Sequence, residues 1–410
     1  MTAPDDFDAK DFDLTVLQVI PALDAGGAER STVEITRAIV DAGGRALVAS
    51  AGGRLVRDVE AAGGEVVIMP VQSKNPLTML ANRDRLARLV RDRGVDIVHA
   101  RSRAPAWSAL AAARAEGAAF VATYHGAYRA QNPVKRFYNS AMARADLVIA
   151  NSQFTADAIT SAYSVDPGRL LVIPRGADMA WFDPAAVAPA RVARLAEDWG
   201  LDRAGDGLIA LLPGRITDWK GHLVAVEAIA RMARADATGG LSGLGAGFQL
   251  IFAGDAQGRD ALEASIGRAI DGAGLAGAIR LVGHCDDMPA AYAVADVVLA
   301  PSTRPEAFGR TAAEAGAMAR TVIAADHGGA RETVADGETG FLVAPNDAAA
   351  LAGALARAAA LGPQGRAEMG ARARARIGDK FSLAAMCAAT IAGYKELSAT
   401  RYSQPARGAA

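Results

Sequence analysis

The sequence predicts an α/β fold made of two doubly wound, Rossmann-like domains that face each other across a cleft. Short β-branched apolar runs alternate with stretches of helical spacing, a pattern typical of βαβ units and parallel sheets. The pattern restarts after a segment rich in Ala, Pro and Asp, at 183–206, which we interpret as the connection between the domains. A length of 410 residues also suits about two domains, each large enough to bury its own core.

The predicted strands are the short apolar runs, taken here in chain order. In the first half of the chain they are "LTVLQVI", "RALVAS", "EVVIMPV", "DIVHA", "AFVATYH", "DLVIANS" and "RLLVIP". In the second half they are "GLIALLPG", "FQLIFAGD", "AIRLVGH", "DVVLAP", "TVIAAD" and "GFLVAP". The stretches between them, such as "NRDRLARLVRDRG", have helical spacing, and the chain after the last strand is predicted to be helical.

The composition excludes several classes of protein. The 44 basic and 45 acidic side chains nearly cancel, so no nucleic-acid partner is predicted. The two cysteines, Cys285 and Cys387, have neither metal-ligand spacing nor a disulfide pattern. The first residues lack the basic start and apolar core of a secretory signal, and no run reaches the roughly 18 apolar residues of a membrane-spanning helix. We therefore expect a cytoplasmic protein.

Distinctive residues follow several predicted strands of the first domain, at the carboxyl ends where open α/β sheets bind ligands. In "PALDAGGAERS", Gly26 and Gly27 allow a tight turn and close approach to a ligand at the start of a helix. An ordinary turn between strand and helix is the alternative interpretation.

Two of the five histidines in the chain stand at neighbouring strand ends. "DIVHARSR" contains His99, Arg101 and Arg103, and "FVATYHGAY" contains His125. A single histidine is more often structural than functional, but two at adjacent strand ends indicate a site. No carboxylate or further histidine stands at ligand spacing beside them, so no metal site is predicted.

The second domain opens with "LLPGRITDWKGH", in which Gly214 permits close approach and Arg215 can bind phosphate oxygens as a fork. Lys220 stands at the expected start of a helix, and it is one of only six lysines among the 44 basic residues. A cationic pair at the positive end of a helix favours a bound anion. A solvated surface pair is the alternative.

The stretch "RPEAFGRTAAE" places Glu306 and Glu314 eight positions apart, about 12 Å if the segment were wholly helical. A helix that begins near Gly309 would present the backbone N–H groups of Gly309, Arg310 and Thr311 to a ligand. Carboxylates can accept hydrogen bonds from sugar hydroxyls, while the backbone donors hold a phosphate. The alternative is a helix N-terminal charge followed by an exposed glutamate.

With these motifs the chain resembles the retaining glycosyltransferases of family four, which have the GT-B fold and use nucleotide-sugar donors. The resemblance covers nearly the whole chain and depends on "GGAER", on "GR" followed by "KG", on "EAFGRTAAE" as an E-x7-E motif, and on "HGGARETVADGETGFLV". Within that family, "HARSRAPAW", "TYHGAY" and "IPRGAD" resemble bacterial enzymes that build lipopolysaccharide core or related surface glycans.

The resemblance implies roles for individual residues. Arg215 and Lys220 would neutralise the donor diphosphate, Glu306 would bind hydroxyls of the transferred hexose-type sugar, and His125 would line the sugar pocket. These four form the predicted catalytic set. The predicted donor-binding residues are Gly26, Gly27, Gly214, Phe308, Gly309, Arg310, Thr311 and Glu314, of which Glu314 would hold the ribose. His99, Arg101 and Arg103 fall where contacts with the acceptor are expected.

The resemblance also implies an organisation and a mechanism. Residues 1–183 would form the acceptor-side domain, with a last helix at 381–400 packed back on it, and residues 184–380 the nucleotide-sugar domain. Transfer would retain the anomeric configuration, with the nucleotide-diphosphate-sugar as co-substrate and no cofactor. No metal is required, since protein cations take its place. The sequence departs from the family pattern at 175–178 and at Arg320 and Thr321.

Residues 128–144 combine basic and aromatic side chains on one predicted helix. Such a helix suits the headgroup region of an anionic bilayer, so we expect peripheral association with the inner face of the inner membrane if the saccharide acceptor is lipid-linked. A solvated helix with buried aromatics is the alternative.

Other functions remain open at this stage. A nucleotide-sugar epimerase of similar fold would act on its donor without an acceptor. A non-catalytic sugar-nucleotide-binding subunit would not need to keep Arg215, Lys220, Glu306 and Glu314 together. A Cys–His hydrolase at His284 and Cys285 is disfavoured, because neighbouring side chains at a strand end point to opposite sides.

Overall fold

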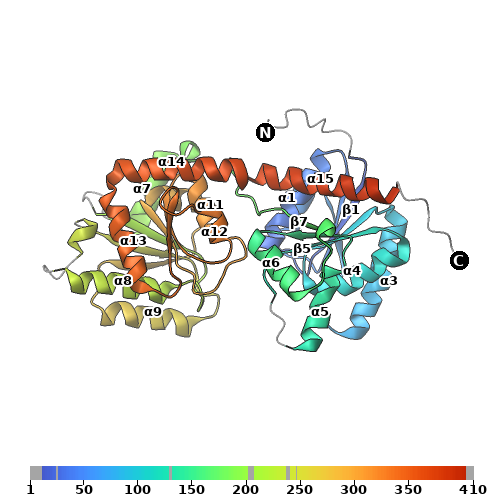
Figure 1. Ribbon diagram of the computed structural model, residues 1–410, viewed down its shortest axis with the longest axis horizontal. Coiled ribbons are helices and arrows are strands. Elements are labelled where there is room, and N and C mark those ends of the chain that lie inside the picture. Colours follow the sequence, from blue (N-terminus) through green and yellow to red (C-terminus); the bar gives the residue numbers. More distant parts are fainter. Residues whose placement is uncertain are drawn as a thin grey trace. The chain divides into compact units, whose positions relative to one another are not determined.

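The computed structural model describes residues 12–24, 26–128, 132–201, 207–236, 241–245 and 247–402. The chain divides into two compact units (Figure 1). The first unit consists of Met1–Pro174 and Ala384–Ala410, and the second of Arg175–Leu383. The chain thus passes into the second unit shortly before the boundary predicted after Asp183, and its last segment groups with the first unit.

The first unit contains a seven-stranded parallel sheet in the order β3-β2-β1-β4-β5-β6-β7. Its strands are β1 (Thr15–Val19), β2 (Arg45–Ser50), β3 (Glu65–Ile68), β4 (Ile97–Ala100), β5 (Ala119–Tyr124), β6 (Leu147–Ala150) and β7 (Leu170–Val172). The order reverses at β1, which pairs with both β2 and β4. This reversal is the topological switch point of a Rossmann-like fold, beside which such sheets bind their ligands.

Helices connect these strands and cover both faces of the sheet (Figure 1). They are α1 (Gly27–Asp41), α2 (Val56–Ala61), α3 (Pro76–Arg93), α4 (Arg103–Glu116), α5 (Pro133–Ala143), α6 (Gln153–Ala162) and α15 (Leu383–Tyr402), with a 3-10 turn at Pro167–Arg169. Polar side chains fix several of the helix starts. Asn75, Asn132 and Ser152 accept hydrogen bonds from backbone N–H groups of α3, α5 and α6, and proline occupies the first turn of α3 and α5.

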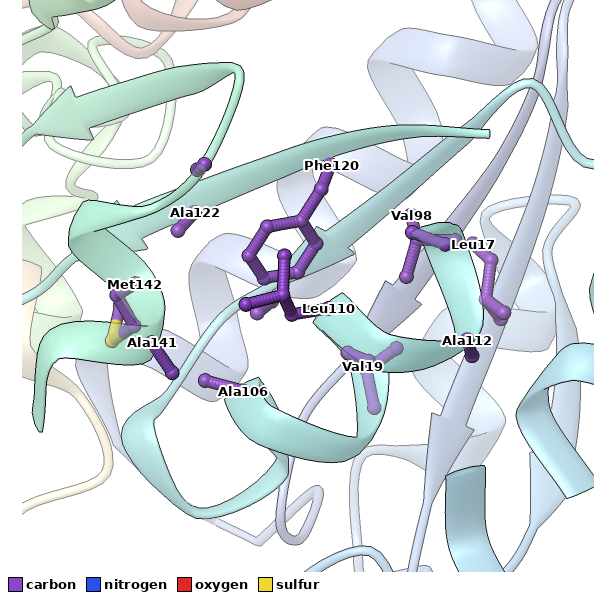
Figure 2. Packing of buried hydrophobic residues seen from close by; sticks show 14 of the residues in the cluster. Leu17, Val19, Val98, Ala106, Leu110, Ala112, Phe120, Ala122, Ala141 and Met142 are labelled. Carbon is purple, nitrogen blue, oxygen red and sulfur yellow. The ribbon is translucent and has the colours of Figure 1, made fainter. Parts of the chain in front are cut away.

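The core on one face of this sheet is built from branched side chains on the strands and small side chains on the helices (Figure 2). The residues labelled there are Leu17, Val19, Val98 and Phe120 with Ala122 on the strands, and Ala106, Leu110, Ala112, Ala141 and Met142 on α4 and α5. Small residues let α4 and α5 approach the sheet closely, so the large ring of Phe120 fills the remaining space.

The opposite face carries α15. His99 alternates with Val98 along β4 and therefore points away from the core of Figure 2. Its Nδ1 lies 2.6 Å from the hydroxyl of Tyr394 on α15. Further along, the Arg401 guanidinium contacts Asp146 and donates to the carbonyl of Gly117 at 2.8 Å. These contacts hold α15 against the sheet and helices of the first unit.

The second unit contains a six-stranded parallel sheet in the order β10-β9-β8-β11-β12-β13. Its strands are β8 (Ile209–Pro213), β9 (Gln249–Ala253), β10 (Ile279–Gly283), β11 (Val297–Ala300), β12 (Thr321–Ala325) and β13 (Gly340–Val343). Its helices are α7 (Pro189–Asp198), α8 (His222–Ala235), α9 (Asp260–Gly272), α10 (Met288–Val294), α11 (Arg310–Ala317), α12 (Ala330–Thr333), α13 (Ala348–Ala360) and α14 (Gly362–Lys380), with 3-10 turns at Pro184–Ala186 and Ser242–Leu244. Every predicted strand of both halves is found, which confirms the two Rossmann-like sheets.

The segment interpreted as a connection is an ordered part of the second unit as far as residue 201. Val187, Ala196 and Trp199 are buried in the core of this unit. Arg191 forms a bidentate ion pair with Asp287, in which Nε and Nη2 lie 2.9 and 2.6 Å from the two carboxylate oxygens. The segment lacks a strand, as expected, but its apolar side chains bury it against α10, and residues 202–206 lie outside the described part.

The two segments at the ends of the second unit pair with each other. The amide of Ala177 donates to the carbonyl of Phe381, and the amide of Leu383 donates to the carbonyl of Ala177, both at 2.8 Å. A Cβ atom on Gly176 would lie 2.4 Å from the backbone of Leu383. Glycine at this position in "RGAD" therefore allows the two chain segments to meet.

Candidate active site

The loops that follow the adjacent strands β8 and β11 bring a lysine and a glutamate together. The Nζ of Lys220 lies 2.9 and 3.0 Å from the two carboxylate oxygens of Glu306. Each side chain is only 16% exposed. The hydroxyl of Ser302 donates to the same carboxylate, so Glu306 is fixed by two donors. Eighty-six positions separate the pair in sequence, and the pairing of β8 with β11 makes them neighbours.

Glycine makes this approach of the two loops possible. Gly221, which follows Lys220, has φ of +82°, and a Cβ there would lie 2.1 Å from the carbonyl oxygen of Pro301. The amide of Thr303 donates to the carbonyl of Trp219 at 2.7 Å. The backbone of the loop after β8 is therefore held directly against the loop after β11.

Arg215 is the second predicted cation, and it is exposed. Its Nη1 donates to the side-chain oxygen of Gln257 at 3.3 Å, a long hydrogen bond to a neutral group. Among the described residues, no carboxylate forms an ion pair with Arg215. Gly214 before it has φ of +129°, and its Cα faces the Lys220 side chain, since a Cβ would lie 3.5 Å from that chain. The exposed guanidinium is therefore available to an anionic ligand, and the backbone before it lies beside the Lys220 side chain.

Glu314 on α11 is held by two donors. Arg310 contacts one carboxylate oxygen through Nε at 3.0 Å and Nη2 at 2.6 Å. The hydroxyl of Tyr292 donates to the other oxygen at 2.9 Å. Burial and then the Glu314 charge raise the pKa of Tyr292 well above its usual value, so the phenol stays protonated and remains a donor. Each carboxylate oxygen keeps lone pairs for hydroxyl groups of a ligand.

The loop after β12 packs directly against the backbone that precedes α11. Gly309 has φ of +81° and precedes the first helical residue, Arg310. The amide of Gly329 donates to the carbonyl of Glu306 at 2.9 Å. A Cβ on Gly329 would lie 2.4 Å from the backbone of Phe308, which is buried. Thr311, predicted to donate its amide to a ligand, is also buried within the helix start.

A small cavity lies behind Glu306, at the carboxyl ends of β11 and β12. Its lining residues are Ala300, Ser302, Glu306, Gly309, Ala312, Ala325, His327 and Ala330. Both ring nitrogens of His327 are buried, and neither has a hydrogen-bond partner among the described residues. Sequence reasoning missed His327, Ser302 and Tyr292. Ser302 and His327 stand shortly after predicted strands, and this position could have marked them as candidate site residues. Tyr292 lies within a helix, and no sequence pattern marks it as a site residue.

In the first unit the predicted residues lie at the carboxyl edge of the sheet, with different surroundings. Gly26 precedes α1 with extended backbone and Gly27 is its first residue. His125 follows β5 and is half-buried. Arg103 is the first residue of α4, and its guanidinium lies 4.0 Å from the centroid of the Tyr128 ring.

His99 and Arg101 are enclosed. His99 is fully buried, and its ring nitrogens lie 2.6 Å from Tyr394 and 2.7 Å from Thr123. Burial lowers the pKa of His99 well below its usual value, so the ring is neutral. Arg101 is also buried and donates to the hydroxyl of Ser31. These contacts leave His99 no nitrogen for a ligand.

The described residues contain no group of three or more His, Cys, Asp or Glu side chains arranged to hold a metal ion. They also contain no helix with the length and apolar character that crossing a membrane requires.

The two Rossmann-like units and the site of the second unit define the GT-B class of glycosyltransferases. Residues 25–181 match the model of Glycosyltransferase Family 4, and residues 194–376 match that of Glycosyl transferases group 1. A glycosyltransferase from Rickettsia africae is 34% identical, with a TM-score of 0.85 over 94% of this chain and 98% of that chain. The chain therefore belongs to this family of glycosyltransferases.

Other solved structures share the fold. HepE from Anabaena, determined in complex with UDP, is 23% identical with a TM-score of 0.81, over 93% of this chain and 100% of that chain. WaaG, described as a glycosyltransferase involved in lipopolysaccharide biosynthesis, is 16% identical with a TM-score of 0.68, over 92% of this chain and 98% of that chain. Likeness at this level of identity concerns the fold alone.

Curated relatives carry a narrower name. The D-inositol 3-phosphate glycosyltransferase of Geodermatophilus obscurus is 34% identical over 256 residues, which are 60% of this chain and 54% of the relative. That of Acidothermus cellulolyticus is 34% identical over 231 residues, 56% of this chain and 48% of the relative. The chain thus spans about half the length of these relatives. Their names do not support the predicted lipopolysaccharide role, which stays a prediction.

Proposed function

We propose that the protein transfers a hexose-type sugar from a nucleotide-diphosphate-sugar to a hydroxyl group of an acceptor. The observation that carries this proposal is the grouping of Lys220, Glu306 and Arg215 at the carboxyl ends of two adjacent strands. Lys220 and Glu306 form a neutral, partly buried pair, and Arg215 lacks a carboxylate partner among the described residues. Such a site offers net positive charge to a diphosphate and a carboxylate to sugar hydroxyls.

The charges suit the reaction. As the bond between the sugar carbon and the phosphate oxygen breaks, negative charge develops on the departing diphosphate. Arg215 and Lys220 are positioned to stabilise that charge, and the N-terminal amides at 308–310 add to it. The sugar carbon forms a new bond with the acceptor oxygen, and the acceptor's hydroxyl proton passes to the diphosphate. Retention of configuration belongs to the proposal through the family resemblance.

The two glutamates have different tasks in this proposal. Glu306 orients Lys220 and accepts hydrogen bonds from hydroxyls of the transferred sugar. Glu314, held by Arg310 and Tyr292, accepts hydrogen bonds from the ribose of the donor. The protein cations make a metal ion dispensable. His125, Gly26 and Gly27 retain the roles that the resemblance implies for them.

The acceptor is the less defined part of the proposal. The sequence motifs favour a saccharide or lipid-linked saccharide of lipopolysaccharide or another surface glycan. The names of the curated relatives instead favour an inositol phosphate, although the chain spans only about half of their length. Both acceptors present a hydroxyl group as nucleophile, so the chemistry in the second unit is the same for either.

Membrane association is a further proposal, and α5 gives it partial support. Val134 is 79% exposed and Phe137 61% exposed at the start of this helix, next to the exposed Arg136. Tyr128 and Tyr138 are half-buried, so they are less accessible to a bilayer than Phe137. Arg129 lies outside the described residues. Flotation with anionic liposomes tests it: binding that is lost on charge reversal at Arg136 supports the proposal, and no binding rejects it.

The function itself is tested by a screen of UDP-, GDP- and ADP-sugars. A true donor should raise the unfolding temperature, because a ligand that binds only the folded state stabilises it. Product analysis of the stabilising donor alone then separates the alternatives. An epimerised sugar would identify an epimerase, and sugar transferred only when an acceptor is added would support the proposal. A complete lack of stabilisation by all three donor classes would contradict it.

A further inference from the structure

His327 lies in the loop after β12, which is fixed against the backbone of Glu306. The amide of His327 donates to the carbonyl of Ala325 at 2.8 Å, and the next residue, Gly328, has φ of +59°. A Cβ atom on Gly328 would lie 2.3 Å from the carbonyl oxygen of Glu306, so a side chain there would not fit. The loop is thus held beside Glu306, and His327 and Glu306 line the same small cavity at the carboxyl ends of β11 and β12.

This cavity contains polar groups that lack a partner. Both ring nitrogens of His327 are buried, and neither has a hydrogen-bond partner among the described residues. An imidazole carries at least one N–H donor whether it is neutral or protonated, and native proteins rarely leave a buried donor unpaired. The other polar side chains of the lining are Ser302 and Glu306, and the remaining lining residues are Ala300, Gly309, Ala312, Ala325 and Ala330.

The cavity has the size and the chemistry for one water molecule. Its volume of about 10 Å³ is the smallest that can hold a water. Water both donates and accepts hydrogen bonds, so it can bond a ring nitrogen of His327 in either tautomer. It can at the same time bond the Ser302 oxygen and a lone pair of the Glu306 carboxylate, and about three such bonds are typical of a buried water.

We propose that a water in this cavity connects His327 to Ser302 and Glu306, and that His327 is a positioning residue for the Glu306 carboxylate. The proposal rests on the proposed function for the task of Glu306. In the free protein Lys220 contacts both carboxylate oxygens. Once the Lys220 ammonium also binds the donor diphosphate, the orientation of the carboxylate toward the sugar depends on Ser302 and on the water that His327 holds.

The first experiment measures the unfolding temperature of the free protein. If a water bonds the ring, His327→Leu removes a partner from the network and should lower the unfolding temperature by about 2 °C or more. His327→Gln keeps a donor and an acceptor and should lose less. An unchanged or higher unfolding temperature for His327→Leu would show that the ring nitrogens had no partner, and equal losses for both variants would indicate lost packing alone. Either result would overturn the proposal.

The second experiment measures donor binding by calorimetric titration. The probes are whichever of UDP-, GDP- and ADP-glucose binds the parent protein most tightly, and the nucleoside diphosphate with the same base. The nucleoside diphosphate has no sugar for Glu306 to hold. We therefore expect His327→Leu to weaken binding of the nucleotide sugar about fivefold, the effect of one lost hydrogen bond, and to leave binding of the nucleoside diphosphate within about twofold. His327→Gln should restore part of the loss.

His284→Leu is the matched control for the loss of an imidazole. His284 follows β10 and its side chain is 66% exposed, so its replacement should not change the ratio of the two affinities. Equal weakening of both ligands by His327→Leu, or the same ratio in both variants, would overturn the positioning role.

A high-resolution crystal structure of the free protein locates the water directly. Density within hydrogen-bond distance of a His327 nitrogen and of Ser302 or Glu306 supports the proposal, and an empty cavity overturns it. Because this structure and the unfolding temperatures need no donor, they test the water site even if none of the nucleotides binds. Absence of nucleotide binding to the parent protein would contradict the proposed function alone.

Discussion

Replacing Glu306 with Gln removes the negative charge that faces Lys220 but keeps the side-chain size and an acceptor oxygen for Ser302. Both partners are 16% exposed and 2.9 Å apart, so water replaces the lost charge only in part. Breaking a fully buried ion pair costs about 3–5 kcal/mol, and a surface pair contributes about 0–1 kcal/mol. We expect about 2 kcal/mol for this intermediate case, or a fall of about 4–8 °C in the unfolding temperature.

The donor should restore much of this loss. In the Glu306→Gln variant a bound diphosphate gives the Lys220 ammonium a new counter-ion, so the gap to the parent protein should narrow when a saturating nucleoside diphosphate is added. Lys220→Met leaves the Glu306 carboxylate without its cation, and a diphosphate adds further negative charge there. Its gap to the parent should therefore widen in the same titration.

Thermal unfolding of the parent, both single variants and the double variant checks this reasoning. Because the two residues form one pair, the double variant should lose at least 1 kcal/mol less than the sum of the single variants. Strict additivity would show that the pair contributes nothing. An identical response of both single variants to the nucleoside diphosphate would refute the assignment of Lys220 to the diphosphate.

Three further predictions concern the second unit. Gly221→Ala places a Cβ against the Pro301 carbonyl at positive φ, so urea denaturation should show a loss of about 2 kcal/mol or more. Gly274→Ala, at positive φ with open space around it, is the control and should lose less. His222 is buried and its pKa is lowered to about 4, so stability should fall as pH drops from about 6.5 toward 4. His222→Phe should flatten that slope by up to about 1.4 kcal/mol per pH unit, and an unchanged slope would contradict the burial argument. Tyr292→Phe leaves a Glu314 oxygen without its donor and should lower the free energy of unfolding by about 1–2 kcal/mol in the same assay.

The strands could be predicted because parallel sheets buried on both faces need continuous apolar runs, and each such run in this sequence is a strand. The sequence predicts that Lys220 and Glu306 lie at the same edge of the sheet, but not that they form an ion pair. Both stand after strands, but their contact depends on β8 pairing with β11, which lies three strands later in the chain. Local spacing carries no information on that pairing.

Other parts of the site could not be predicted, for identifiable reasons. Tyr292 reaches Glu314 from α10, and no sequence rule links a helical tyrosine to a carboxylate on another helix. The family resemblance implied an acceptor contact for His99, but its buried ring uses both nitrogens to contact Tyr394 and Thr123.

The central claim is that fixed protein cations in the second unit stabilise a departing diphosphate. The rate of sugar transfer by an Arg215→Ala/Lys220→Ala double variant, at saturating donor and acceptor, tests it most directly. Each cation is expected to supply about 3 kcal/mol, so the rate should fall at least about 100-fold. Transfer at the speed of the parent protein would contradict the account.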